Sequence, residues 1–196
     1  MFGLFSKKQP AYIIRDIIWK SSAKKIQALT TELSAHATKT IIITYFPDTQ
    51  RDVEQALQMS GIAYSHEINS PENVVVASAA VLSRSSRNPV GYRILFAEHH
   101  PSFKKEEALL QRITDGGTNI PVTFYVAMDE PLMQLFGSDR IMSVMEKMGF
   151  QEDESIEHTM ISTSIQRAQQ KIDEQQAFPL EASSAASWLQ LNNIRF

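Results

Sequence analysis

The sequence predicts an α/β fold, in which helices flank a largely parallel sheet. Segments typical of strands and of helices alternate from residue 11 to residue 128, with short connections between them. The run TIIITYF at residues 40–46 is almost continuously apolar, as expected for a strand covered on both faces. Alternation of this kind is typical of parallel sheets with right-handed crossovers.

The first predicted unit is a strand followed by a helix. Residues 11–19 (AYIIRDIIW) are rich in β-branched and aromatic side chains, which favour a strand. Ser21 or Ser22 then provides a helix cap, and the helix is expected to run to about His36. Its apolar side chains recur at helical spacing on one face, at Ile26, Leu29 and Leu33.

The alternation continues after residues 40–46. Pro47 ends that strand, Asp48 or Thr49 is expected to cap the next helix, and Gly61 stands where a helix C-terminal glycine belongs. The remaining α/β elements are expected as strands at 62–68, 73–81, 92–97 and 121–128 and a helix at 103–113, with a break at 115–117.

After Asp129 the pattern becomes helical, with helices expected at 132–136, 139–148 and about 155–176. The last of these carries a narrow apolar seam typical of helix pairing. It consists of Ile161, Ile165, Ala168 and Ile172. The seam requires one covering surface, which is either the chain's own sheet or a protein partner.

The patterns divide the chain into four parts. Residues 1–10 are expected to be a flexible N-terminus, 11–129 the α/β domain, 130–176 a helical extension and 177–196 a C-terminal tail. The tail ends in apolar residues, so we expect it to dock on the body of the chain or on a partner.

Composition excludes several classes of protein. The net charge of -3 gives no indication of a nucleic-acid partner, and the absence of cysteine excludes disulfides and thiolate catalysis. No apolar run approaches the roughly 20 residues of a membrane-spanning helix. Phe2, Leu4 and Phe5 precede Lys7 and Lys8, an order that does not fit a secretory signal. We expect a cytoplasmic protein, with peripheral membrane contact through these three apolar residues as the open alternative.

Known catalytic and cofactor motifs are missing from the sequence. None of the seven glycines is followed by lysine, so there is no phosphate-binding loop of the GxxxxGK[ST] type. GxGxxG and GxSxG are also absent. The densest polar cluster is Glu98-His99-His100, but adjacent histidines on a strand face opposite sides and do not easily share a metal. We therefore expect no catalytic residue, no cofactor and no metal site.

The stretch from residue 124 to residue 171 resembles a known family. It is similar to the end of the second RecA-like motor domain of the SecA protein-translocation ATPase, together with the start of its scaffold helix. The matching residues, in order, are Phe124-Tyr125, Leu132-Met133, Phe136-Gly137, Arg140-Ile141, Met145 with Gly149, Ile156-Glu157-His158 and Ala168-Gln169. Residues 11–120 resemble the earlier part of the same domain more loosely. The resemblance implies a RecA-like fold and a connection with protein export.

The departures from the family concern its catalytic loops. Working members have a glycine- and arginine-rich segment where this chain has Ala77 to Arg84, which contains no glycine. Their arginine finger lies in a glycine-containing helix, of which only Gln111 and Arg112 remain here. An arginine finger neutralises charge that develops in phosphoryl transfer. We therefore predict a degenerate, non-enzymatic interaction module related to SecA.

Three hypotheses follow for its function. As an interaction module, it would bind the translocation motor, a membrane-associated protein or a second copy of itself. The partner surface would comprise Met133, Phe136 and the seam residues Ile161, Ile165, Ala168 and Ile172. Alternatively, the chain is a nucleotide-binding partial subunit that completes an ATPase site with another chain, through Arg84 or Arg112. A weaker third idea is a small-molecule enzyme whose site lies in the loops after Val81 and Glu98.

Overall fold

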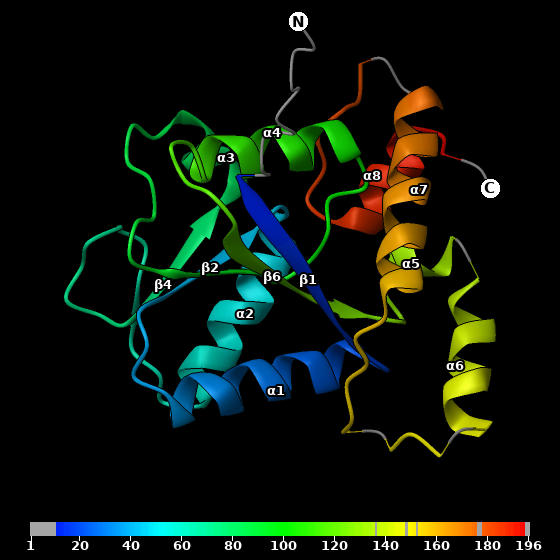
Figure 1. Ribbon diagram of the computed structural model, residues 1–196, viewed down its shortest axis with the longest axis horizontal. Coiled ribbons are helices and arrows are strands. Elements are labelled where there is room, and N and C mark those ends of the chain that lie inside the picture. Colours follow the sequence, from blue (N-terminus) through cyan, green and yellow to red (C-terminus); the bar gives the residue numbers. More distant parts are fainter. Residues whose placement is uncertain (1–10, 136, 148, 152, 176–177, 195–196) are drawn as a thin grey trace, which may run out of the picture.

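The computed structural model has one six-stranded sheet, whose paired strands all run parallel (Figure 1). It describes residues 11–135, 137–147, 149–151, 153–175 and 178–194. The strand order is β1-β6-β5-β2-β4-β3. The strands are β1 (Tyr12–Trp19), β2 (Thr40–Thr44), β3 (Tyr64–Ser65), β4 (Val74–Ser78), β5 (Arg93–Phe96) and β6 (Ile120–Ala127). This arrangement confirms the predicted α/β class, a parallel sheet flanked by helices.

Helices cover both faces of the sheet. On one face lie α1 (Ser22–Ala35) and α2 (Pro47–Met59), whose apolar residues form one core cluster with the sheet. A second cluster on the other face includes side chains of α3 (Ala79–Arg84), α4 (Phe103–Ile113), α5 (Pro131–Gln134), α7 (Thr159–Gln175) and α8 (Ala185–Leu191). Figure 1 shows α1 on one side of the strands and α4, α7 and α8 on the other, with α6 (Ser138–Lys147) at the periphery.

Strand β2 shows why the apolar run identified the fold. All five of its residues are buried, and successive side chains enter opposite layers. Ile41 and Ile43 belong to the cluster beneath α3 and α4, whereas Ile42 belongs to the cluster beneath α1 and α2. A strand with helices on both sides buries both of its faces, which accounts for the three consecutive isoleucines at its centre.

Some predicted boundaries were wrong. The strand expected at 73–81 ends at Ser78, whose side chain accepts a hydrogen bond from the Val81 backbone and caps α3. The strand expected at 62–68 has only two paired residues, Tyr64 and Ser65. Helix α2 begins at Pro47, before the expected cap at Asp48 or Thr49, because proline is favoured in the first helical position.

The chain after α6 returns to the sheet. Residues 155–158 are not helical, contrary to expectation, and α7 begins at Thr159. Within this segment Ile156 exchanges two backbone hydrogen bonds with Ile18 of β1, at 2.9 and 3.0 Å, which hold it extended. The tail then forms α8, which the sequence did not predict, and Trp188 of α8 is completely buried in the body of the chain.

No helix in the described ranges combines the length and the hydropathy that crossing a membrane requires. Residues 1–10, with the proposed membrane-contact residues Phe2, Leu4 and Phe5, lie outside the described residues.

Candidate functional site

The sheet has one position where ligands are expected to bind. Strands β2 and β5 are neighbours, but α2 follows β2 on one face and α4 follows β5 on the other. The two chain segments therefore separate at the carboxyl ends of these strands. In open α/β sheets, a crevice of this kind is the usual binding site.

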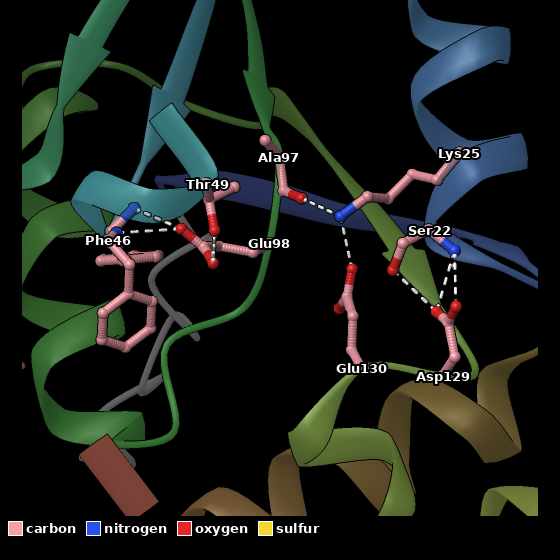
Figure 2. A network of polar contacts seen from close by, with 9 residues as sticks. Ser22, Lys25, Phe46, Thr49, Ala97, Glu98, Asp129 and Glu130 are labelled. Carbon is pink, nitrogen blue, oxygen red and sulfur yellow. Dashed lines mark hydrogen bonds and ion pairs between the residues drawn. The ribbon is translucent and has the colours of Figure 1, made fainter. Parts of the chain in front are cut away.

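Glu98 occupies this crevice. It follows β5, and its Oε1 accepts hydrogen bonds from the backbone nitrogens of Tyr45 at 2.9 Å and Phe46 at 3.0 Å. Its Oε2 accepts one from Thr49 Oγ1 at 2.6 Å (Figure 2). Burial raises the pKa of Glu98 to about 7, against the opposing effect of these hydrogen bonds. The chain's own carboxylate thus binds the N–H groups at the start of α2.

A second carboxylate binds the start of α1. Asp129, just after β6, accepts hydrogen bonds from the backbone nitrogen of Ser22 at 2.8 and 3.0 Å and from Ser22 Oγ at 2.7 Å (Figure 2). Beside it, the Nζ of Lys25 forms an ion pair with Glu130 and donates a hydrogen bond to the carbonyl of Ala97 at 2.6 Å. The positive charge of Lys25, which lines the crevice, is therefore neutralised by Glu130.

A third carboxylate binds the start of α4. Asp173 of α7 accepts hydrogen bonds from Ser102 Oγ at 2.5 Å and from the backbone nitrogen of Lys104 at 2.8 Å. Helices α1, α2 and α4 each follow a parallel strand, so all three begin at the carboxyl edge of the sheet. Each of these helix starts is occupied by a carboxylate from elsewhere in the chain.

His99 lies in a buried ionic network beneath this edge. Its Nδ1 is 3.0 Å from both carboxylate oxygens of Glu106, and its Nε2 is 3.2 Å from Asp16 Oδ1. The ring stacks on Phe124, with the ring centroids 4.1 Å apart. Burial alone would lower the pKa of His99, but Glu106 and Asp16 raise it to about 10. The imidazolium form, with both nitrogens donating, satisfies the two carboxylates.

The pKa of His100 is shifted in the opposite direction. Its Nδ1 accepts a hydrogen bond from the backbone nitrogen of Ser102 at 2.8 Å, and burial, assisted by Lys105, lowers its pKa to about 3. The two histidines thus contact different groups. Within the described part of the chain, no three side chains of histidine, aspartate or glutamate are placed to hold a metal ion.

The space left at the carboxyl edge is small. A cavity of about 220 Å³ remains there, and the segment before α8 lies at its rim. Ser183 accepts a hydrogen bond from the backbone nitrogen of Asp48 at 3.0 Å and donates its hydroxyl to the Asp48 carboxylate at 3.1 Å. The cavity lining includes Ser22, Lys25, Thr49, Asp129, Glu130 and Ser184.

The two arginines proposed to bind nucleotide do not enter this crevice. Arg112 lies in the last turn of α4, away from the carboxyl edge where α4 begins. Its guanidinium donates hydrogen bonds to Asn88 Oδ1 at 3.0 Å and to the Ser85 carbonyl, so it holds the loop after α3. Arg84 is an exposed residue at the end of α3.

The proposed partner surface is largely internal. The four seam residues of α7 are buried in the core shared with α4, as is Met133 of α5. Their assignment as a docking face is therefore corrected: the seam packs on the chain's own body, the first of the two alternatives, because α4 and the sheet supply the apolar surface it needs. Phe136 lies outside the described residues.

Sequence reasoning missed the three carboxylates that define the edge. Glu98 belonged to the cluster singled out in the sequence, but its role as a helix cap could not be inferred. Of the residues that donate hydrogen bonds to Glu98, Thr49 is the nearest in the sequence, and it is 49 positions away. Asp129 and Asp173 had no recognisable signal, since Ser22 and Ser102 lie 107 and 71 positions from them.

Comparison with known proteins identifies relatives of this fold. A family model described as the SecA P-loop domain matches residues 41–153. The SecA protein translocase subunit of Bacteroides thetaiotaomicron is 48% identical over 84 residues, which cover 43% of this chain and 8% of that protein. The SecA subunit of Chlorobium phaeovibrioides is 42% identical over 94 residues, or 48% of this chain and 9% of the relative.

The chain thus spans less than a tenth of the curated relatives it matches. Among solved structures, an arterivirus helicase (nonstructural protein 10) in complex with DNA aligns with a TM-score of 0.40 and 15% identity, over 61% of this chain and 29% of that one. That similarity is too weak to support a conclusion. The family model, by contrast, covers more than half of the 196 residues. The chain belongs to the SecA P-loop domain family.

Proposed function

We propose that this chain is a SecA-related binding module that acts in protein export and does not hydrolyse ATP. The observation that carries the proposal is that the chain's own carboxylates fill the carboxyl edge of the sheet. The starts of α1, α2 and α4, where backbone N–H groups would meet a bound phosphate, are occupied by Asp129, Glu98 and Asp173.

Electrostatics at this edge disfavour a nucleotide. A phosphate would have to displace Glu98 or Asp129 and then lie close to the displaced negative charge. The cation at the crevice, Lys25, is buried in an ion pair with Glu130, so it is not free to compensate. In addition, no glycine of the sequence is followed by lysine, so the chain has no phosphate loop of its own.

The alternative is a partial subunit that completes an ATPase site with another chain. That function needs an arginine that reaches a phosphate held by the partner. Arg112 is engaged with Asn88 and Ser85, and it lies at the far end of α4 from the crevice. These contacts favour a structural role for Arg112 and give the alternative no specific support.

The link to protein export rests on the family. The relatives are named as protein translocase subunits, and this chain retains the sheet and the helix α7 that follows it. We propose that it binds the translocation motor or a membrane-associated partner, in the cytoplasm or at the membrane surface. Such binding would use the retained fold without the chemistry of the motor.

A deletion experiment tests this role. Removal of the coding sequence should slow the export of a pulse-labelled precursor that carries a signal sequence, and expression of the intact chain should restore the rate. The purified chain should also bind purified SecA of the same cell saturably in an interferometry assay. Unchanged export in the deletion strain, together with no binding to SecA or to membranes, would contradict the export role.

A further inference from the structure

The tail, residues 178–194, covers the crevice at the carboxyl edge with one short helix. Helix α8 packs on α5, and Figure 1 shows α8, in red, close to α5. The side chain of Trp188 is completely buried, and its ring meets the ring of His100 edge to face, with the centroids 5.3 Å apart. The cavity at this edge, of about 220 Å³, is lined on the tail side by Ser184, Ala185 and Ala186. The tail thus occupies a groove formed by α5 and the segment after β5.

The tail is held together by its own hydrogen bonds. The side-chain amide of Asn192 accepts a hydrogen bond from the backbone nitrogen of Leu180 at 2.7 Å and donates one to the Leu180 carbonyl at 3.0 Å. The same amide donates to the carbonyl of Trp188 at 2.8 Å. Ser184 caps α8 by accepting a hydrogen bond from the backbone nitrogen of Ser187 at 3.2 Å. Since these bonds do not involve the body of the chain, the tail can keep them when it leaves the groove.

The tail's polar contacts with the body lie outside the Trp188 pocket. Ser183 exchanges two hydrogen bonds with Asp48, at 3.0 and 3.1 Å. Glu181, whose side chain is 79% exposed, forms an ion pair with Lys105. The main apolar attachment is Trp188, and no described residue accepts a hydrogen bond from its buried Nε1. A buried donor without an acceptor weakens the attachment, because the indole N–H has given up its hydrogen bond to water.

We propose that the tail is an autoinhibitory plug, and that the groove beneath it is the docking site for a protein partner that presents a short helix with a tryptophan anchor. The segment seated in the groove shows this chemistry: α8 has the buried ring of Trp188 at its centre and small residues at its start. Because the plug is tethered, it competes with the partner at an effective concentration of about a millimolar. A partner therefore opens the groove only if it binds more tightly than α8.

This inference rests on the proposed function as a binding module and names the surface that binds. The two can nevertheless fail separately, because the tests of the plug use only this chain and a peptide of its own sequence. A tail that never leaves the groove would overturn the plug and leave the export role to the deletion experiment. Unchanged export in the deletion strain would remove the biological role and leave the groove in place.

A binding assay with the isolated tail tests the groove. The probe is a fluorescein-labelled synthetic peptide of residues 178–194, and the receptor is the full chain with Trp188→Ala, whose own tail lacks the anchor. Fluorescence anisotropy should show saturable binding to this variant. Binding to the wild-type chain should be at least about tenfold weaker, because the plug closes the groove for about nine-tenths of the time or more.

Two controls make the assay specific. Leu191→Ala changes a residue of the same helix that is 51% exposed, and this variant should bind the peptide as weakly as the wild type does. The peptide that itself carries Trp188→Ala should not bind any of the chains. Equal binding of the unsubstituted peptide to the wild type and to Trp188→Ala would overturn the proposal. So would the absence of binding to a Trp188→Ala chain that circular dichroism shows to be folded.

Release of the plug can also be followed without changing the tail. The chain has two tryptophans, so Trp19→Phe leaves Trp188 as the only one. In a urea titration, the emission of Trp188 should shift to longer wavelength at a lower urea concentration than the loss of helical circular dichroism, because a locally attached segment opens before the core. Coincident transitions would overturn the proposal, since Trp188 would then unfold only together with the sheet.

Discussion

The carboxylate of Glu98 lies 3.0 Å from the backbone nitrogen of Phe46, at the start of α2. Glu98 follows β5 and Phe46 follows β2, so this hydrogen bond closes the crevice between the two central strands of the sheet. The position where a related fold would present N–H groups to a ligand is filled from within the chain.

Glu98 should make stability depend on pH. Its pKa is about 7 in the folded chain and 4.5 in the unfolded chain, so the folded state holds the proton more tightly. The stabilisation is complete below pH 4.5 and is lost as the pH rises to about 7, by about 3 kcal/mol. Denaturant titration should show that the stability of the wild type relative to Glu98→Gln falls over this interval. A difference that does not vary with pH would contradict the burial of an ionisable Glu98.

Removal of the capping carboxylates should open the edge to anions. In the double variant Glu98→Ala, Asp129→Ala, the N–H groups at the starts of α1 and α2 lose their acceptors, and inorganic phosphate is expected to bind there weakly. The control is Glu67→Ala, Asp153→Ala, which removes one glutamate and one aspartate from exposed positions. Calorimetry with phosphate should show heat of binding for the first variant only. Equal behaviour of the two variants would show that the carboxylates do not exclude phosphate.

His99 should be essential for stability. The variant His99→Leu leaves Asp16 and Glu106 buried without their cation, which typically costs about 3–5 kcal/mol. Urea unfolding should show this loss, and further substitution of Asp16→Asn and Glu106→Gln should recover much of it. If His99→Leu unfolds at nearly the wild-type urea concentration, the network is not ionised as described.

The network around His99 also has a pH signature. Because the pKa of His99 rises from 6.5 in the unfolded chain to about 10 in the folded chain, its stabilisation is present below pH 6.5 and lost as the pH increases towards 10. The reference is the triple variant that combines His99→Leu, Asp16→Asn and Glu106→Gln, in which the network carries no ionisable group. Relative to that variant, the wild type should lose stability across this interval in denaturant titrations.

Substitution of Lys25 should lower the free energy of unfolding far more than substitution of its neighbour Lys24. Lys25→Met leaves Glu130 buried without its partner, so we expect a loss of about 3–5 kcal/mol in the free energy of unfolding. Lys24→Met removes only a hydrogen bond to Gln27 at the surface, and its effect should be within about 0.5 kcal/mol. Thermal or denaturant unfolding of the two variants measures the difference. Equal effects would contradict the ion pair at the carboxyl edge.

The sequence predicted the layers of the fold because they depend on local patterns. The apolar run of β2 and the helical spacing of Leu29 and Leu33 are visible in short windows. The α7 seam was recognised as a face that needs a covering surface, but its spacing did not identify that surface, and the predicted docking role was wrong. That surface includes α4, more than 45 residues earlier in the chain.

The site could not be predicted for a related reason. The starts of α1, α2 and α4 are each bound by a carboxylate that is distant in sequence, and a lone Asp or Glu has many possible roles. The start of α4 is bound by Asp173 of α7, a helix for which the sequence predicted only an apolar packing seam. Helix α8 was also missed, because the small residues at 183–187 give no helical pattern, although Trp188 anchors the segment in the core.

The most direct test of the central claim is calorimetry of the purified chain with ATP and with ADP, in the presence of magnesium, with turnover assayed on the same sample. The internal carboxylates at the starts of α1, α2 and α4 predict no saturable binding at millimolar nucleotide and no hydrolysis. Saturable binding of either nucleotide by the wild-type chain would contradict the account and would direct attention to a second chain that supplies the phosphate loop.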